Sequence, residues 1–250
     1  SVKGVLGGDV GSKFLSEAAS ISQSYVPVSE QIAAVDETYR IVNNQFSTES
    51  STLLLPTHGL PVGACQGACD AVVSQRDALH YIQNETIKLI NYGTPLDDIA
   101  TLVRLPASLA DSPYTKEYAA NTSMLVRSIY RETLGWFTAD PFELTPMSTL
   151  EQAARFIDLA GGEKPVLEAA RKAITEHTLN GANWAFYLMS QLRQVYPSTD
   201  ADNIYIAALK MLAYFASSAQ VRNYYLTLKY MAESNTMTVE PLLLEAEPEE

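Results

Sequence analysis

The hydrophobic pattern of the first 92 residues predicts the order strand, helix, strand, helix. Segments 2–10 and 53–55 are short apolar runs bounded by glycine or proline, which is typical of buried strands. Between them, Ser29 is a suitable N-cap, and a helical apolar stripe follows it. A longer amphipathic helix is predicted from Gly67 to Tyr92. The first stripe consists of Ile32, Val35, Tyr39, Val42 and Phe46.

From residue 93 onward the pattern is helical throughout. Gly93 ends one helix, and Thr94 as N-cap with Pro95 at the first helical position begins the next, over 95–103. A long helix is predicted over residues 113–137. Further helices are expected at 148–159, with Ser148 and Glu151 as a capping box, at 164–177, 182–196 and 200–216, and from Val221.

The last helices alternate small and large apolar residues, as in a tetratricopeptide-like stack with a hairpin turn at Asn180-Gly181. Two helix pairs are few for an extended peptide-binding groove, so we expect a scaffold. The fold class predicted from these patterns is mainly α, with a short β/α portion at the N-terminal end.

Composition narrows the function classes. The chain has 250 residues, 47% hydrophobic and 18% charged, which is globular and allows one large domain or two modest ones. Its net charge of −12 argues against a nucleic-acid partner, because phosphate binding needs clustered Lys and Arg. The longest apolar run, Ile204 to Ala216, contains Lys210 and is too short to cross a membrane, so no membrane span is expected.

Two residues are candidate metal ligands. His58 follows the strand 53–55 in a turn, PTHGLP, where a rigid strand end and small neighbours would let an ion approach. Asp9 follows Gly8, and a carboxylate can bridge two cations through its two oxygens. The alternatives are a plain turn histidine at His58 and an Asx-type turn at Asp9.

The two cysteines and the other two histidines are expected to have structural roles. Cys65 and Cys69 share one helix face, but no second Cys or Cys/His pair stands near enough in sequence to complete a tetrahedral site, so we favour small, semi-buried thiols. His80 is expected at a surface or interface, and His177 as a charge at a helix C-terminus.

Four motifs, in this order, resemble the alkyl sulfatases of the metallo-β-lactamase superfamily over most of residues 52–230. They are the turn PTHG, the helix RDALHYIQNETIKLINYG, the segment SPYTKEYAANTSMLVRSIYRETLGWF and the segment NYYLTLKY. The resemblance implies that residues 1–64 are the C-terminal portion of an αββα metallo-β-lactamase-like domain. It implies an all-helical dimerisation domain, hence a homodimer, over 65–234, and an acidic tail or linker over 235–250.

The resemblance also implies chemistry. Asp9 and His58 would be ligands of the second of two zinc ions, in an enzyme that hydrolyses a small-molecule sulfuric ester. The family's first-metal cluster, His-x-His-x-Asp-His, is absent, since none of the three histidines lies within two residues of another. We therefore expect a C-terminal piece of a longer zinc hydrolase that binds zinc weakly or not at all by itself. A degenerate relative without zinc chemistry is the alternative.

Some residues depart from the family pattern. Met124-Leu125 stands where alkyl sulfatases have His-Asn, and a Gly-Asp turn is more typical of the superfamily at large. Tyr118, Arg127 and Tyr130 match, although packing and ion pairing explain them equally well. Another ester, a thioester or a lactone is therefore an alternative substrate, and a non-catalytic dimerisation or scaffold module is an alternative function.

Overall fold

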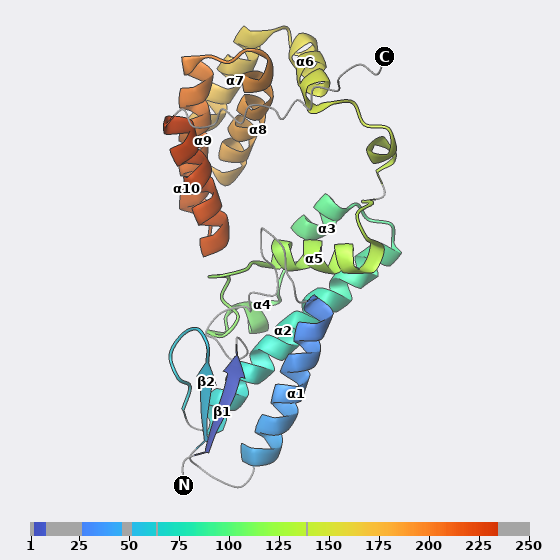
Figure 1. Ribbon diagram of the computed structural model, residues 1–250, viewed down its shortest axis with the longest axis vertical. Helices are drawn as coiled ribbons and strands as arrows, with labels where there is room; N and C mark the ends of the chain where they lie inside the picture. Colours follow the sequence, from blue (N-terminus) through green and yellow to red (C-terminus); the bar gives the residue numbers. More distant parts are fainter. Residues whose placement is uncertain (1–2, 9–26, 47–51, 64, 139, 235–250) are drawn as a thin grey trace, which may run out of the picture. The chain divides into compact units, whose positions relative to one another are not determined.

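The protein is described by a computed structural model that covers residues 3–8, 27–46, 52–63, 65–138 and 140–234. Asp9, the polar segment 12–26 and the acidic tail 235–250 lie outside these residues. The described part is mainly helical, as predicted (Figure 1). Its elements are β1 (Lys3–Gly8), α1 (Val28–Phe46), β2 (Thr52–Pro56), α2 (Cys65–Asn91), α3 (Leu96–Leu102), α4 (Ala107–Ala110), α5 (Thr122–Leu134), the 3-10 helix η1 (Pro141–Leu144), α6 (Thr149–Leu159), α7 (Glu163–Thr175), α8 (Leu179–Val195), α9 (Thr199–Phe215) and α10 (Ala219–Glu233).

The chain forms two compact units. The first runs to Pro146 and includes the short segment Ser217–Gln220. The second comprises Met147–Ala216 and the chain from Val221. Within the described residues, no helix is both long enough and apolar enough to cross a membrane.

In the first unit, β1 and β2 pair in parallel and are connected through α1. The register runs from Lys3 opposite Thr52 to Gly8 opposite Pro56, with an irregularity between Leu6 and Gly8. A parallel pair needs a crossover connection, and α1 supplies it.

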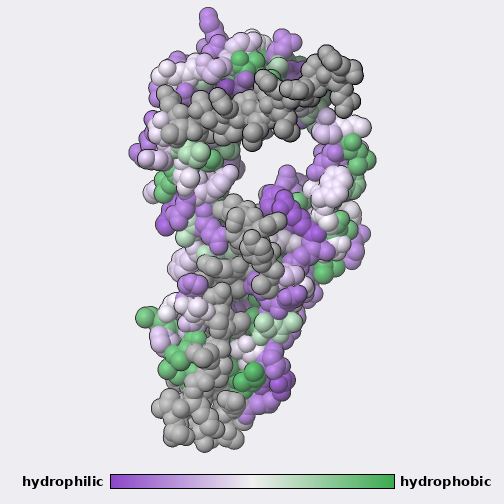
Figure 2. All heavy atoms as spheres, in the orientation of Figure 1, coloured by the Kyte–Doolittle hydropathy of each residue, from purple (hydrophilic) through white to green (hydrophobic). Residues whose placement is uncertain are grey.

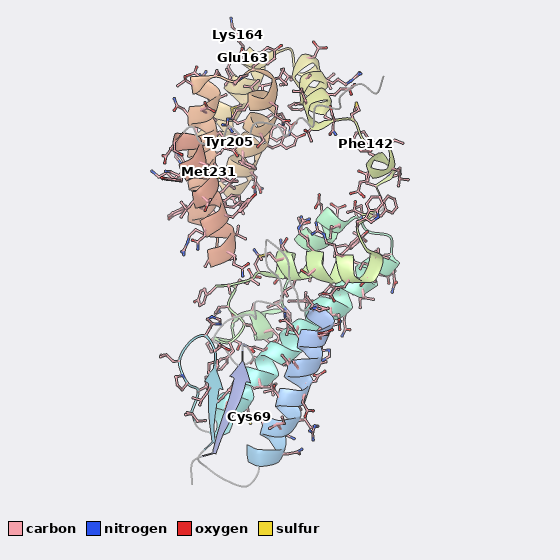
Figure 3. The ribbon with its side chains drawn as sticks, in the orientation of Figure 1. Cys69, Phe142, Glu163, Lys164, Tyr205 and Met231 are labelled. Carbon is pink, nitrogen blue, oxygen red and sulfur yellow. The ribbon has the colours of Figure 1, made fainter. Side chains whose placement is uncertain are left out.

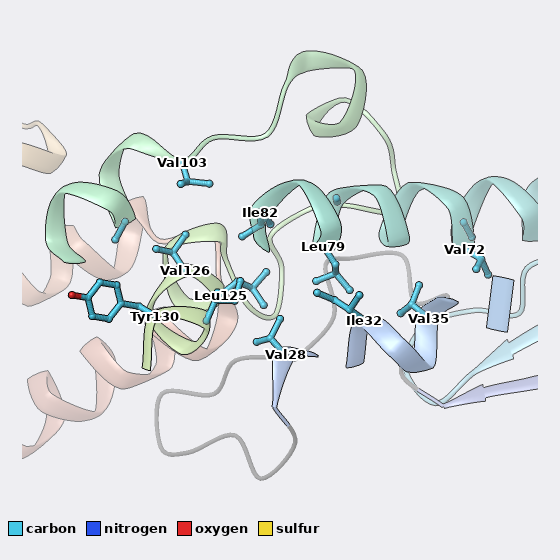
Figure 4. Close-up of a cluster of buried hydrophobic side chains, with 14 of the residues drawn as sticks. Val28, Ile32, Val35, Val72, Leu79, Ile82, Val103, Leu125, Val126 and Tyr130 are labelled. Carbon is cyan, nitrogen blue, oxygen red and sulfur yellow. The ribbon is translucent and has the colours of Figure 1, made fainter. Parts of the chain in front are cut away.

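The core of this unit lies between α1, α2 and α5 (Figure 4). The predicted stripe of the first helix is confirmed at Ile32, Val35, Tyr39 and Val42, which lie in or against this core, whereas the side chain of Phe46 lies outside the described residues. The amphipathic pattern predicted for the second helix is likewise observed in α2. Thr86, a buried polar residue of α2, donates its hydroxyl to the backbone oxygen of Ile82 at 2.6 Å, so its burial leaves no unsatisfied donor. The buried members include Ile32, Val35, Val42, Val72, Leu79 and Ile82.

The second unit packs α7, α8 and α9 around an apolar core to which α6 and α10 also contribute. The predicted helices are confirmed within a few residues, including the Ser148 N-cap, whose hydroxyl accepts from the backbone nitrogen of Glu151 at 3.2 Å. The predicted position of the hairpin turn, Asn180-Gly181, is wrong. The turn lies at Glu176–Thr178, because the Thr178 hydroxyl caps α8 by accepting from the Gly181 nitrogen at 3.0 Å, so Asn180 and Gly181 belong to the first helical turn.

Three predicted helix starts are wrong for similar reasons. The helix predicted over 113–137 begins only at Thr122, since Asn121 caps it and the Glu117 carboxylate accepts from the Thr122 nitrogen and hydroxyl at 2.8 and 2.6 Å. α3 begins at Leu96 with Pro95 as N-cap, so Thr94 stands outside the helix. Ser29 lies inside α1. The first turn of α5 is fixed by Asn121 and Glu117, and that of α1 by Glu132, none of which the local pattern indicated. The start of α3 is fixed by Pro95 itself.

Candidate functional site

The end of the small sheet carries the one predicted metal ligand that the structure describes. Leu54 and Val62 exchange two backbone hydrogen bonds of 2.9 Å, which closes the intervening residues into a loop with His58 at its middle. Leu54 and Val62 are buried, whereas His58 is exposed. Gly59 follows with φ 96°, a left-handed conformation that favours glycine. The loop is therefore anchored at its base and presents His58 to solvent at its tip.

Asp9 lies outside the described residues, so its position relative to His58 stays a prediction. Gly8, the residue before it, pairs with Pro56, two residues before His58. Among the described residues, no three or more His, Cys, Asp or Glu side chains are grouped so that they could hold a metal ion.

Cys69, His80 and His177 have structural surroundings, whereas the side chain of Cys65 lies outside the described residues. Cys69, half-buried on α2, packs against the core of the first unit, as expected of a small semi-buried thiol (Figure 3). His80 Nε2 lies 3.0 and 3.1 Å from the two carboxylate oxygens of Asp36 and so joins α2 to α1 at the surface. His177 is exposed and adopts φ 50° just after α7, which agrees with a residue that ends a helix. The sequence around His80 did not indicate Asp36 as its partner, because the two residues are 44 positions apart.

The residues that match or depart from the alkyl sulfatase pattern lie on or before α5. Leu125 is fully buried, and Met124 is half-buried against the same core. Tyr130 is also buried, and Arg127 pairs with Asp97 of α3 at 2.8 Å. Tyr118 is exposed and precedes the helix. Packing and ion pairing therefore account for Tyr130 and Arg127 in this chain.

Large apolar side chains are exposed at many of the described positions, and two groups of them lie close together in the sequence. One is the segment from the end of α5 through η1, with Trp136 and Leu144 the most exposed. The other is α10, where Tyr224 and Tyr230 are exposed while Ala232 is buried. Exposed apolar groups that gather in this way are typical of protein–protein contact surfaces.

Comparison with known proteins identifies relatives of this chain. The family model described as "Alkyl sulfatase dimerisation" matches residues 95–235. A linear primary-alkylsulfatase of Pseudomonas sp. is 34% identical over 176 residues, which cover 70% of this chain and 33% of that protein. An alkyl/aryl-sulfatase of Saccharomyces cerevisiae is 29% identical over 175 residues, which cover 70% of this chain and 27% of that protein.

The fold is shared with a solved structure. The stereoselective inverting sec-alkylsulfatase Pisa1 from Pseudomonas sp. superposes with a TM-score of 0.82 at 24% identity, over 92% of this chain and 35% of that chain. The chain thus spans about a third of the length of the relatives it matches.

Proposed function

Because the chain belongs to the alkyl sulfatase dimerisation family, we propose that its helices join two copies of an alkylsulfatase-type hydrolase into a homodimer. The observation that carries this proposal is the extent of the family match. It begins one residue before α3 (Leu96–Leu102) and ends two residues after α10 (Ala219–Glu233), so it follows the boundaries of helices. Both compact units contribute to it.

The proposed division of the chain has residues 1–64 closing a metallo-β-lactamase-like domain, 65–234 forming the dimerisation domain, and 235–250 a tail or linker. The order β1, α1, β2 at the N-terminal end supports the first assignment. Since α1 and α2 share one core across residue 64, we regard this boundary as a division of function within one packed unit.

We further propose that Asp9 and His58 hold zinc. The parallel pairing of Gly8 with Pro56 supports this, because Asp9 is one residue and His58 two residues beyond the paired positions. Consecutive Cα atoms are about 3.8 Å apart, so both side chains would start near the same end of the sheet. Imidazole and carboxylate are both common zinc ligands, and the exposed tip of the loop leaves His58 accessible.

Two ligands are fewer than the four of a typical zinc site. We infer that the remaining ligands and the catalytic cluster belong to a longer enzyme of which this chain is the C-terminal part, which accords with its covering about a third of its relatives. Zinc, when bound, would supply a Lewis acid beside the ester. Asp9 and His58 would hold and orient it.

For the substrate we propose a small-molecule sulfate ester, because the relatives are named as alkylsulfatases. The burial of Leu125, at a position where the alkyl sulfatase pattern described above has a polar residue, favours a second candidate. In that case the chain is a non-catalytic dimerisation scaffold, or it serves a hydrolase that acts on another ester or a thioester.

The proposal is tested by co-expressing tagged and untagged copies and by titrating zinc. Wild type, Asp9→Ala, His58→Ala and the control His177→Ala should all co-purify as pairs, because helices rather than metal make the contact. Zinc should bind weakly to the wild type and to His177→Ala, and more weakly still when Asp9 or His58 is replaced.

Each outcome addresses a different part of the proposal. Failure of the wild-type copies to co-purify contradicts homodimerisation. Equal zinc affinity in His58→Ala and His177→Ala contradicts the metal assignment, and tight stoichiometric zinc in the wild type contradicts the inference that further ligands lie elsewhere.

A further inference from the structure

The described residues of segment 134–144, which are 134–138 and 140–144 and which we call the 134–144 loop, expose apolar side chains in the first unit. Its exposed fractions are 48% for Leu134, 70% for Trp136, 43% for Phe142 and 61% for Leu144. Figure 2 shows apolar surface, in green, along the segment that follows α5, and Figure 3 labels Phe142 on η1. Taking about 200 Å² for each such side chain, the loop exposes on the order of 450 Å².

This surface is held in shape by the loop's own polar groups. Thr138 donates from its backbone nitrogen and its hydroxyl to the Glu143 carboxylate, both at 2.8 Å. The Asp140 carboxylate accepts from the backbone nitrogen of Phe142 at 2.9 Å. These hydrogen bonds restrain Thr138, Phe142 and Glu143 before a partner binds, which lowers the conformational entropy that they lose on binding.

We propose that the 134–144 loop docks against a second copy of this chain. This inference rests on the proposed homodimerisation and identifies the loop as part of its contact surface. The loop lies inside the region matched by the dimerisation family. Its exposed area is about half of the roughly 800 Å² that each partner contributes to a stable interface.

The chemistry of the loop fits a contact between identical, strongly acidic chains. Each copy carries a net charge of −12, so a charged patch would repel its own copy. Interface cores favour aromatic residues and are depleted in charge, and tryptophan is one of the residue types enriched at hot spots. The two carboxylates of the loop, on Asp140 and Glu143, accept from donors within the loop itself. In a two-fold dimer the same patch serves both subunits, so one substitution removes contacts twice.

The test compares two double variants of the full 250-residue chain by sedimentation equilibrium. Trp136→Ala with Phe142→Ala should raise the dimer dissociation constant about 100-fold, since a truncated hot-spot residue typically costs more than tenfold. The control, Tyr92→Ala with Tyr214→Ala, removes two aromatic side chains that are 76% and 84% exposed. This control variant should change the dimer dissociation constant by no more than about threefold. Circular dichroism checks that both variants are folded.

A second measurement does not depend on truncating the loop. The chain has two tryptophans, so Trp184→Phe leaves Trp136 as the only indole. Its fluorescence should shift to longer wavelength, and acrylamide should quench it more strongly, as dilution separates the dimer.

The outcomes separate the two levels of the proposal. A wild-type chain that is monomeric at every concentration overturns homodimerisation and this inference with it. A dimeric wild type whose dissociation constant is unchanged by the loop variant overturns the loop assignment alone. A dimer in which Trp136 is quenched as strongly as in the monomer also overturns the loop assignment, because Trp136 is then outside the dimer interface.

Discussion

Glu132 Oε1 lies 2.5 Å from the backbone nitrogen of Val28, 104 residues earlier in the chain, and Glu132 Oε2 lies 3.3 Å from the nitrogen of Ser29. The first backbone N–H groups of a helix have no partner within the helix, and a carboxylate there also interacts favourably with the helix dipole. A side chain of α5 (Thr122–Leu134) therefore caps α1 (Val28–Phe46) and ties the N-terminal β/α portion to the helices of the dimerisation family.

Removing this cap should destabilise the first unit. Glu132→Ala is expected to lower the free energy of unfolding by about 1–2 kcal/mol, as is usual for a lost N-cap. Glu132→Gln should lose less, because an amide oxygen still accepts one hydrogen bond. Urea denaturation followed by circular dichroism measures both. The control Glu168→Ala alters an exposed carboxylate on α7 (Glu163–Thr175) and should stay within about 0.5 kcal/mol of wild type. Equal losses in Glu132→Ala and Glu168→Ala would show that the cap contributes nothing.

Introducing the His-Asn pair of the alkyl sulfatase pattern at positions 124 and 125 should lower the free energy of unfolding by different amounts at the two positions. Leu125→Asn places an amide in a fully buried site and is expected to destabilise the chain by about 3–5 kcal/mol. Met124→His changes a half-buried side chain and should cost no more than about 1.5 kcal/mol. The same denaturation experiment measures the difference. If both variants are equally stable, Leu125 does not belong to the core.

Alkaline pH should weaken the second unit through two tyrosines. Burial raises the pKa of Tyr205, more than the neighbouring Arg193 lowers it, and burial also raises the pKa of Tyr225. The stability linked to the neutral phenols is fully present below about pH 10 and is lost as the pH rises from there through the folded-state pKa values.

Replacing Tyr205 and Tyr225 by phenylalanine should therefore flatten the loss of stability above about pH 10. Tyr214→Phe, at a side chain that is 84% exposed, should leave the loss as it is. Unfolding midpoints measured at several alkaline pH values test this. If the double variant still loses as much stability as the wild type at alkaline pH, groups other than Tyr205 and Tyr225 cause the alkaline sensitivity.

The parts of the fold that depend on neighbouring residues were predictable from the sequence. The helix predicted over Gly67–Tyr92 is observed as α2 (Cys65–Asn91), because its apolar stripe spans many turns. The predicted Ser148 cap is likewise observed, since a capping serine acts on a residue three positions away.

Features set by distant partners were not predictable. Nothing near Ser29 indicates that Glu132 would cap the helix at Val28, and nothing near His80 points to Asp36. The burial of Leu125 likewise depends on α1 and α2 (Figure 4). For the candidate site, the sequence placed His58 in a turn after a strand, which is observed, whereas the short bridge between Leu54 and Val62 that closes its loop is visible only in the structure.

Pairing of this chain with a second copy of itself is tested most directly by sedimentation equilibrium of the wild-type chain over a wide concentration range. We expect a mass of twice the 27.4 kDa of one chain at micromolar concentration, unchanged by a zinc chelator. A mass of 27.4 kDa at every concentration would contradict the account.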